Sequence, residues 1–291
     1  MRPGGTGPKR IETLEAGAWR LGTRLDAMTS NLRPLIFALP LLLAMGCQSA
    51  PETMQPPVLG EPLRTVHTSS ATIAGTQLQY QLSLPHSDDV PVGGWPLLLF
   101  LHGAGERGTQ IDLVGFHGPL KHASEFPELR GAVIVAPQCP EDAWWRADAL
   151  KTLVDEVRAA HSIDGDRLYL TGLSMGGYAT WGLVSRFPNA FAAAVPICGG
   201  GDTQRLWGGP PSGFEIDGLL RASHVPIRAF HGQDDRVVPM AESQLLIDAL
   251  QAAGSDATLT IYPGVGHDSW TETYANGELY TWMFAQERGA D

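Results

Sequence analysis

The sequence predicts an α/β domain built on a mostly parallel central sheet with helices on both faces. From about Arg64 onward, short apolar runs that suit buried strands alternate with segments that suit helices. Polar residues and glycines follow several of these runs directly. The chain has 291 residues, 43% of them hydrophobic. This is enough apolar material for a large core, and we expect the domain to span residues 64–291.

The domain opens with two segments, 65–73 and 77–84, that we expect to pair as antiparallel strands. Six continuous apolar runs follow, which is typical of parallel strands because both of their faces are covered. These strands are expected at residues 96–103, 131–138, 167–174, 190–197, 226–233 and 258–265. Helices are expected between or after them at residues 147–161, 176–187, 240–253 and 277–287. The longest insert, 198–225, is rich in glycine and is expected to form loops above the sheet.

The carboxyl ends of parallel strands share one edge of the sheet, and ligands bind at that edge in open α/β folds. A residue with polar or reactive side-chain chemistry stands at or just after the end of each of the six runs. These residues are His102, Gln138, Ser174, Cys198, His231 and His267. The sequence therefore predicts that side chains suited to catalysis meet on one rim of the sheet.

The N-terminal region contains a short apolar segment at residues 34–45, between Arg33 and Gly46. It is too short to cross a bilayer, which takes roughly 20 residues. An apolar run behind a positive charge is typical of a secretory signal. The segment also resembles a bacterial lipoprotein signal, in which the cysteine after the cleavage site receives lipid, so Cys47 is the expected lipidation site. Cleavage without lipidation and a retained membrane anchor are the alternatives.

Residues 1–46 are thus expected to form an N-terminal extension and a lipoprotein-type signal peptide, with translation starting at Met28. Residues 47–63 are rich in Pro and polar residues and are expected to form a flexible tether. The protein is expected to be exported and lipid-anchored to the bacterial cell envelope, on its periplasmic or cell-surface side. Without residues 1–46 the chain keeps 14 basic and 28 acidic residues, a net charge of −14. Since nucleic-acid binding needs clustered Lys and Arg, no nucleic-acid partner is expected.

The most informative motif is G-x-S-x-G at Gly172–Gly176, which follows one predicted strand and opens a predicted helix. In a nucleophile elbow the serine occupies a strained turn, and the glycines let strand and helix approach without a β-carbon clash. A purely structural glycine-rich turn is the alternative. Because the strand–turn–helix context is the one that the elbow requires, we interpret Ser174 as a nucleophile.

A serine hydroxyl needs a base to activate it, and the base needs a group that orients it. In proteins with this elbow the chain order is serine, acid, histidine. His267 follows the last predicted strand, where a loop can bring its imidazole to Ser174, and it is the predicted base. The acid is expected in the stretch HGQDDRVVP at residues 231–239, which offers Asp234 and Asp235.

The charge that develops on the reacting carbonyl oxygen requires backbone N–H donors. We expect one donor at Met175 and the other in the loop LHGAGERG at residues 101–108, at Ala104, with Gly103 as the near alternative. A glycine-rich loop can also bind phosphate, but this one lacks the lysine of a P-loop and the spacing of a dinucleotide fingerprint. No H-E-x-x-H or paired Cys/His spacing is present. Neither a metal nor a cofactor is expected.

Six motifs taken together resemble one group of enzymes: LHGAGERG, APQCPEDAWW, GLSMGGYATW, PICGGGDT, HGQDDRVVP and YPGVGHDSWTETY. Over residues 95–285 the chain is similar to α/β-hydrolase esterases often labelled predicted peptidases or phospholipase/carboxylesterase-like proteins. These enzymes are related to feruloyl and acetyl-xylan esterases and to polyester depolymerases. The resemblance implies the α/β-hydrolase fold and a Ser-His-Asp triad. It also favours Asp235 over Asp234, because the HGxxDxxVP pattern of many serine esterases has its Asp at that place.

Three tryptophans, Trp144, Trp145 and Trp270, lie near the expected site and are interpreted, with Gly103, as substrate-binding residues. Core packing is the alternative for each tryptophan. Two cysteines, Cys139 and Cys198, follow strands that the usual order of this fold separates by two others, or about 14 Å. A disulfide needs α-carbons closer than about 7 Å. We therefore expect two free, buried thiols.

The function that the resemblance implies is a serine carboxylic-ester hydrolase acting through an acyl-enzyme on short-chain or aryl- and carbohydrate-linked esters. Its partners would be a small-molecule or polymer-linked ester substrate and, through the lipid anchor, a membrane. A serine peptidase of the same fold is the alternative within hydrolases. A lipoprotein that uses the fold only for binding is the alternative from another class. The sequence predicts neither the acyl and alcohol preference nor the oligomeric state.

Overall fold

The computed structural model describes most of one compact unit of the chain, Pro56–Asp291. The described residues are 61–86, 90–202 and 214–289. The predicted signal segment with Cys47, the predicted start at Met28 and nearly all of the predicted tether lie outside them, and these stay predictions. Within the described ranges, no helix combines the length and the apolar character that crossing a membrane requires.

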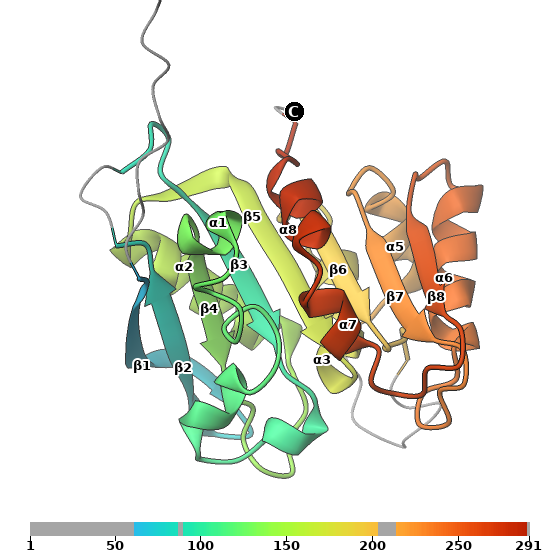
Figure 1. Cartoon of the computed structure of the whole chain (residues 1–291), viewed down its shortest axis with the longest axis horizontal. Helices are drawn as coiled ribbons and strands as arrows, with labels where there is room; N and C mark the ends of the chain where they lie inside the picture. Colours follow the sequence, from blue (N-terminus) through green and yellow to red (C-terminus); the bar gives the residue numbers. More distant parts are fainter. Residues whose placement is uncertain (1–60, 87–89, 203–213, 290–291) are drawn as a thin grey trace, which may run out of the picture. The chain divides into compact units, whose positions relative to one another are not determined.

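Eight strands form one sheet in the order β1-β2-β4-β3-β5-β6-β7-β8 (Figure 1). Their bounds are Leu63–Ile73 (β1), Thr76–Leu84 (β2), Trp95–Leu101 (β3), Val133–Pro137 (β4), Ile163–Leu173 (β5), Ala193–Ile197 (β6), Arg228–Gly232 (β7) and Thr258–Tyr262 (β8). Strand β2 runs antiparallel to both β1 and β4, and the remaining neighbours are parallel. The predicted fold class, a mostly parallel sheet that opens with an antiparallel pair, is confirmed.

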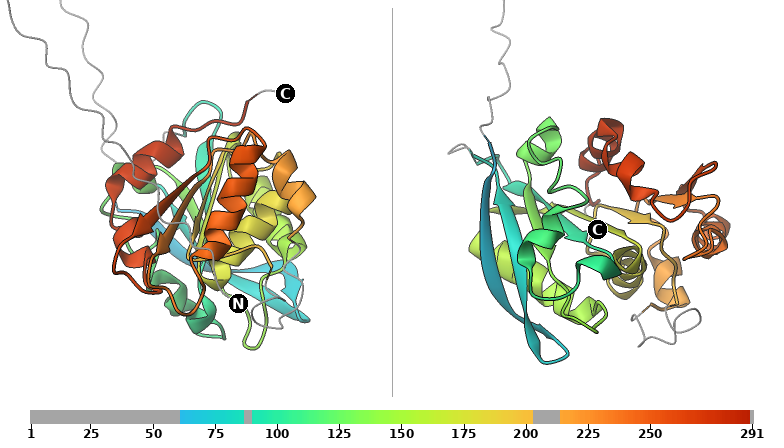
Figure 2. Two further views of the ribbon diagram at one scale, coloured as in Figure 1. Left: turned by 90° about the vertical axis from the view of Figure 1, so that its right-hand side faces the viewer. Right: turned by 60° about the horizontal axis from the view of Figure 1, so that its bottom comes forward.

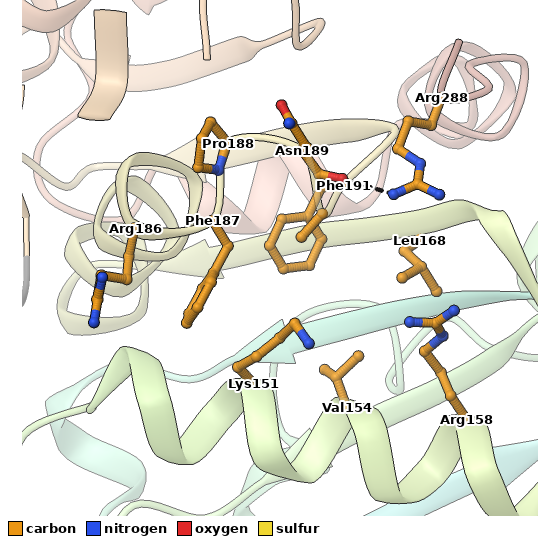
Figure 3. Close-up of a pocket in the computed structure, with 11 residues that line it drawn as sticks. Lys151, Val154, Arg158, Leu168, Arg186, Phe187, Pro188, Asn189, Phe191 and Arg288 are labelled. Atoms are coloured by element: carbon orange, nitrogen blue, oxygen red, sulfur yellow. Dashed lines mark hydrogen bonds between the residues drawn. The ribbon is translucent and has the colours of Figure 1, made fainter. Parts of the chain in front are cut away.

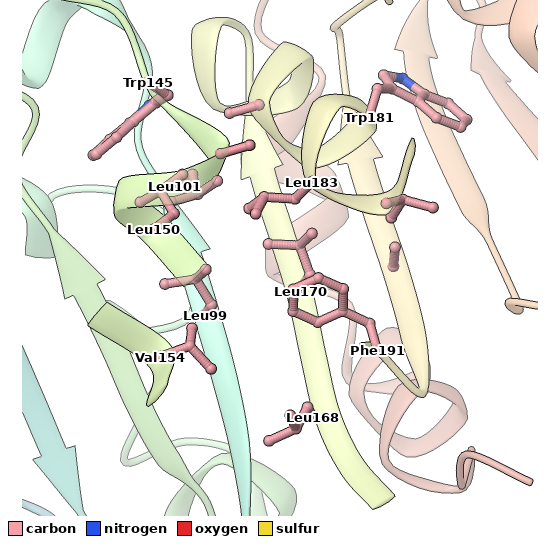
Figure 4. Close-up of a cluster of buried hydrophobic side chains, with 14 of the residues drawn as sticks. Leu99, Leu101, Trp145, Leu150, Val154, Leu168, Leu170, Trp181, Leu183 and Phe191 are labelled. Carbon is pink, nitrogen blue, oxygen red and sulfur yellow. The ribbon is translucent and has the colours of Figure 1, made fainter. Parts of the chain in front are cut away.

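Successive residues of a strand point to opposite faces of the sheet, so the continuous apolar runs supply two cores. On β3, Leu97, Leu99 and Leu101 belong to one cluster of buried side chains, part of which Figure 4 shows. Leu98 and Phe100 belong to the other. The sheet is therefore buried on both faces, as a parallel sheet must be.

Helices cover both faces of the sheet (Figure 2). The cluster that contains Leu99 is completed by α2 (Ala147–Ala160), α3 (Met175–Arg186), α5 (Ile216–Arg221) and α6 (Ala241–Ala252). The cluster that contains Phe100 is completed by α1 (Pro127–Arg130), α7 (Trp270–Tyr274) and α8 (Gly277–Phe284). Helix α2 shows why: Leu150, Val154 and Val157 recur at helical spacing and form one buried stripe.

The four longer helices begin and end within three residues of their predicted bounds, but the shorter ones were not predicted. Helices α1, α5 and α7 have four to six residues, too few to show a helical period. The expectation of loops throughout residues 198–225 is therefore wrong at Ile216–Arg221. In that helix Leu219 is buried against the core cluster of α3 and α6, so tertiary packing stabilises a segment whose local pattern is weak.

Candidate active site

Ser174 occupies the turn between β5 and α3, with φ of 51° and ψ of −114°. Residues with a side chain seldom adopt this backbone conformation, and functional sites are where such strain is tolerated. The neighbouring glycines make the turn sterically accessible. A Cβ at Gly176 would lie 2.0 Å from the carbonyl oxygen of Leu101, and one at Gly172 would lie 2.4 Å from that of Gly176. The motif thus holds the start of α3 against β3 and β5 and presents Ser174 at the carboxyl end of the sheet.

The structure brings Ser174, His267 and Asp235 into one hydrogen-bonded series. His267 Nε2 lies 2.9 Å from Ser174 Oγ, and His267 Nδ1 lies 2.7 Å from Asp235 Oδ2. The three residues follow three different strands, β5, β8 and β7, whose carboxyl ends share one edge. Both contacts are satisfied when Nδ1–H donates to the carboxylate and the serine hydroxyl donates to Nε2. In this tautomer the imidazole is ready to accept the serine proton.

The carboxylate of Asp235 is buried and receives four donors. Its Oδ1 accepts the backbone N–H groups of Val237 and Val238 at 2.8 and 2.9 Å. Its Oδ2 lies 2.7 Å from His267 Nδ1 and 3.2 Å from His231 Nε2. Burial raises the pKa of Asp235, but the hydrogen bonds from the two histidines and the two amides outweigh burial and hold the pKa well below its ordinary value. The group is therefore a carboxylate throughout the neutral range and accepts the N–H of His267 Nδ1.

The neighbouring carboxylates are used differently. Asp234 is exposed, and its backbone N–H donates to the carbonyl oxygen of Val265 at 2.9 Å. Asp268 accepts the N–H and the hydroxyl of Thr271, both at 3.0 Å, in the turn before α7. Of these three carboxylates, Asp235 is the one that forms a hydrogen bond with His267 within the described residues.

The loop after β3 lies beside Ser174. A Cβ at Gly103 would be 3.7 Å from the Cβ of Ser174. Ala104 begins a short 3-10 segment, Ala104–Glu106, and Met175 begins α3. Because N–H groups in the first turn of a helix have no partner within the helix, both amides are open to an external acceptor. This arrangement suits an oxygen atom that becomes negative when Ser174 attacks its carbonyl carbon.

His102 anchors that loop, a role that the sequence did not assign to it. The ring is buried, its Nε2 accepts the backbone N–H of Cys139 at 3.0 Å, and its Nδ1 donates to the carbonyl oxygen of Gly103 at 2.6 Å. Burial lowers the pKa of His102 to about 4; Arg107 adds to the lowering and the bond to Gly103 opposes it. His102 is thus neutral and ties the loop after β3 to the end of β4. The sequence places His102 at a strand end, but its partner Cys139 is 37 residues away.

The three tryptophans have separate positions. Trp145 is 3% exposed, donates Nε1–H to the carbonyl oxygen of His102 at 3.2 Å and packs edge-on against the His102 ring. It supports the loop from within the core, so its interpretation as a substrate-binding residue is corrected to core packing. Trp144 is partly buried against the same core cluster. Trp270 packs edge-on against His267, with ring centroids 5.4 Å apart, and so lies beside the predicted base.

Glu106, His117 and Trp270 form a wall next to the site, which joins the loop after β3 to Trp270. His117 is its central residue and was not part of the sequence motifs. The His117 ring lies 5.7 Å from that of Trp270, and its Nε2 lies 3.7 Å from Glu106 Oε1. Two buried atoms of this wall, Glu106 Oε2 and Trp270 Nε1, have no hydrogen-bond partner within the described ranges. Buried polar atoms are nearly always paired, but unpaired ones are not confined to this wall, since Trp181 Nε1 and Ser83 Oγ also have no partner within the described ranges.

Cys139 and Cys198, the two cysteines within the described ranges, are free and buried. Strands β3 and β5 lie between β4, which precedes Cys139, and β6, which precedes Cys198, as the expectation of free thiols assumed. Burial raises the pKa of Cys139 to about 12 and that of Cys198 further. Both thiols are therefore protonated and poor nucleophiles. Among the residues described, no group of three or more His, Cys, Asp or Glu side chains is arranged to hold a metal ion.

His231 is the third residue that the structure adds, after His102 and His117. Its fully buried ring places Nε2 near both Asp235 Oδ2 and the carbonyl oxygen of Val238, which is 2.9 Å away. Its Nδ1 lies 2.8 Å from Ser243 Oγ, which is also 2.9 Å from the carbonyl oxygen of Gly199. His231 therefore connects the loop that carries Asp235 with α6 and the end of β6.

Removing the His231 donor is expected to loosen Asp235. For His231→Leu we expect kcat/KM for p-nitrophenyl acetate to fall by about tenfold to a hundredfold, because a hydrogen bond to a charged group contributes about 1.5–3 kcal/mol. In His231→Gln the amide nitrogen can replace Nε2, so most of the activity should return. Steady-state kinetics and thermal unfolding of both variants check this. Equal losses of activity in both would contradict a role for the donor.

Comparisons with known proteins place this geometry in context. Residues 114–279 match the model of the dienelactone hydrolase family. A poly(3-hydroxyoctanoate) depolymerase from Pseudomonas fluorescens is 24% identical over 287 residues, which cover 87% of this chain and 99% of the depolymerase. A bifunctional acetylxylan esterase/xylanase from Neocallimastix patriciarum is 26% identical over 203 residues, which cover 64% of this chain and 26% of that protein.

Solved structures show the same fold. A thermostable esterase superposes with a TM-score of 0.66 and 34% identity, over 78% of this chain and 64% of the esterase chain. A ferulic acid esterase superposes with a TM-score of 0.59 and 16% identity, over 77% of this chain and 98% of the esterase. The chain therefore spans nearly all of the depolymerase but slightly less than two thirds of the thermostable esterase.

Proposed function

The chain belongs to the dienelactone hydrolase family, and from this premise we propose that it is a serine carboxylesterase for short-chain, aryl or carbohydrate-linked esters. Its relatives make it a hydrolase of ester bonds. The observation that carries the finer proposal is the series of hydrogen bonds from Asp235 through His267 to Ser174, which ends on a serine in a strained turn. Nucleophilic catalysis by a serine requires this arrangement, and few structural roles do.

In the proposed mechanism Ser174 Oγ attacks the ester carbonyl carbon while His267 Nε2 takes the serine proton. Asp235 keeps the other imidazole proton on Nδ1 and stabilises the imidazolium ion. The backbone N–H groups of Met175 and Ala104 donate to the oxyanion of the tetrahedral intermediate. His267 then gives its proton to the leaving alcohol, and an acyl-enzyme on Ser174 remains. Water, activated by the same imidazole, releases the acid and restores the serine.

The proposed substrate class is supported by the surroundings of His267. Trp270 offers an aromatic surface beside the base, on which a flat acyl group or a sugar ring can pack. The names of the relatives, a depolymerase of poly(3-hydroxyoctanoate) and an acetylxylan esterase, further support esters that are linked to a polymer. Esters are favoured over peptides because the matches cover 99% of the depolymerase and 98% of the ferulic acid esterase, whereas they cover 43% of the acylaminoacyl peptidases that share the fold.

A substrate panel tests this proposal. The purified protein is assayed on p-nitrophenyl acetate, butyrate and octanoate, on methyl ferulate and on an aminoacyl p-nitroanilide. We expect cleavage of the acetate, butyrate or ferulate esters at a kcat/KM of about 10⁴ M⁻¹s⁻¹ or more, with the anilide at least about a hundredfold slower because its amine is a poorer leaving group. Preferential cleavage of the anilide would contradict the esterase proposal and favour the serine peptidase.

A further inference from the structure

A cavity lies away from Ser174, between α2 and the connection from α3 to β6 (Figure 3). Its volume is about 350 Å³, within the range of small-molecule sites. Leu168, in its wall, and Ser174 are six residues apart along β5, or about 20 Å at 3.3 Å per residue. The cavity therefore opens toward the amino ends of the strands, whereas Ser174 lies at their carboxyl ends.

The cavity is lined by four cations and no carboxylate: Lys151, Arg158, Arg186 and Arg288. The described residues contain 13 Lys and Arg in all, so nearly a third of them line this one site. The whole chain is acidic, with 31 Asp and Glu against 20 Lys and Arg. A cluster of one sign on a protein of the opposite net charge creates a local field that attracts anions.

The carboxylates that pair with these cations lie outside the cavity lining. Lys151 Nζ is 2.7 Å from Asp155, and Arg186 Nε is 3.6 Å from Asp148. These are contacts between partly exposed groups, which contribute little binding energy but restrict the side chains. Arg186 contacts Asp148 through Nε, so the N–H groups on its two Nη atoms are available to a ligand.

Arg158 and Arg288 also lie near carboxylates outside the cavity lining, but they are held to different degrees. Arg158 Nη1 lies 4.0 Å from Asp155, beyond hydrogen-bond distance. Arg288 contacts Asp166 and also donates Nη1–H to the carbonyl oxygen of Asn189 at 2.8 Å. Figure 3 shows that the two guanidinium groups approach Leu168 from opposite walls. An anion placed between them would meet donors from both sides.

The rest of the lining is apolar. Val154 and Leu168 come from α2 and β5, and Phe187 and Phe191 come from the connection that follows α3. Lys151 Nζ and Arg186 Cζ lie 5.9 and 5.7 Å from the centre of the Phe187 ring. The aromatic surface and the charges are therefore adjacent, so one ligand can contact both.

We propose that this cavity is a second ligand site that binds an amphipathic carboxylate. The apolar body of the ligand packs against the partly exposed ring of Phe187, and its carboxylate is bound by Arg158, Lys151 and the neighbouring cations. An inorganic anion leaves the aromatic surface unused, and a neutral apolar molecule leaves the cations unused. The acids that ester hydrolysis releases belong to this ligand class, but the site does not depend on the proposed function.

Calorimetric titration of the whole protein with trans-cinnamate tests the proposal. We expect one mole of cinnamate bound per mole of chain, with negligible binding of cinnamyl alcohol, which lacks the charge, and of acetate, which lacks the apolar body. Lys151→Gln combined with Arg158→Gln should weaken cinnamate binding by about tenfold or more, because both donors to a charged group are lost. Arg221→Gln, at an exposed position outside the cavity, should leave binding unchanged.

Two further variants separate this site from the neighbourhood of Ser174. Trp270→Ala should leave cinnamate binding intact, since Trp270 is not part of the cavity lining. The single variant Arg158→Gln should weaken binding by about threefold to tenfold, and it serves as the measurement if the double variant does not fold. Ester hydrolysis and thermal unfolding of the cavity variants should match those of the natural chain.

Four results would overturn the proposal. The first is the absence of detectable heat at 10 mM cinnamate, which would mean a Kd far above roughly 1 mM. The second is equal binding of cinnamyl alcohol, and the third is unchanged binding in the Lys151 and Arg158 variants. The fourth is loss of binding in Trp270→Ala. Binding of phosphatidylglycerol vesicles without binding of cinnamate would also overturn it and would identify the cation cluster as a membrane-facing surface. Failure of the esterase assays leaves this binding test unaffected, so the two proposals fail independently.

Discussion

Replacing Ser174 with Ala is expected to lower kcat/KM for p-nitrophenyl acetate by about 10⁴-fold or more, to the rate that transition-state binding supports without a nucleophile. The reason is that the Oγ atom, 2.9 Å from His267 Nε2, is the atom that forms the acyl-enzyme in the proposed mechanism. The measurement is steady-state kinetics together with labelling by a fluorophosphonate, which reacts with an activated serine. Ser174→Ala should neither hydrolyse the ester nor accept the label.

The fold should not change in this variant. Alanine keeps the β-carbon, so the backbone at φ 51° is strained to a similar degree and the thermal midpoint should stay within a few degrees. Ser185→Ala is the matched control: Ser185 is a buried serine of α3, the helix that follows Ser174, and its Oγ donates to the carbonyl oxygen of Gly182. It should retain activity. Near-normal ester hydrolysis by Ser174→Ala would refute the proposed mechanism.

Replacing Asp235 with Asn is expected to lower kcat/KM by about 10³- to 10⁴-fold, the size of effect known for the equivalent change in other serine triads. Asp235 accepts four hydrogens, whereas an asparagine side chain has one acceptor oxygen and one NH₂ group. If that oxygen keeps the N–H groups of Val237 and Val238, the NH₂ group faces His267 Nδ1. The imidazole must then carry its proton on Nε2, where it is unable to accept the proton of Ser174.

The low pKa of Asp235 also sets the sign of a stability effect. Because the pKa is held below its ordinary value, the carboxylate stabilises the fold above the ordinary Asp range, near pH 4, and this contribution is lost as the pH falls further. The difference in unfolding free energy between the natural chain and Asp235→Asn should therefore be largest near neutral pH and shrink below about pH 4. Urea unfolding at pH 7 and pH 3 measures it.

Asp234→Asn is the matched control for both measurements. Asp234 is adjacent in sequence and exposed, and its contact with the core is made by its backbone N–H. We expect kcat/KM within about twofold of the natural chain and an unchanged dependence of stability on pH, since surface substitutions usually cost less than about 0.5 kcal/mol. Equal losses in Asp234→Asn and Asp235→Asn would indicate a general disturbance of the loop rather than a specific role of Asp235.

Several features of the site followed from local sequence patterns. The elbow was predicted because its glycine spacing and its strand–turn–helix context are local patterns, although the close approach at Gly176 is to Leu101 of β3. The strands were predicted because apolar runs report burial on both faces. The position of His267 followed from chain order and from the common edge on which parallel strands end. Each of these inferences depends on residues that are close in sequence or on a general rule of sheet topology.

Other features depended on contacts between distant segments. His102 contacts Cys139, 37 residues away, and Trp145 donates to the same loop from 43 residues away. No local pattern distinguishes Trp145, which is core, from Trp270, which lies beside His267. The interpretation of all three tryptophans as substrate-binding residues failed at Trp145 for this reason.

By itself, the sequence determined the order and type of the main elements, the strained turn at Ser174 and the chain order of the predicted triad. These depend on local sterics and on the periodicity of apolar residues. Only the tertiary structure decided that His231 and His102 hold the loops of the site, and that Arg158 and Arg288 share a cavity with Phe187. Side-chain directions in separate elements are set by how the helices pack on the sheet, and this packing is a property of the whole fold.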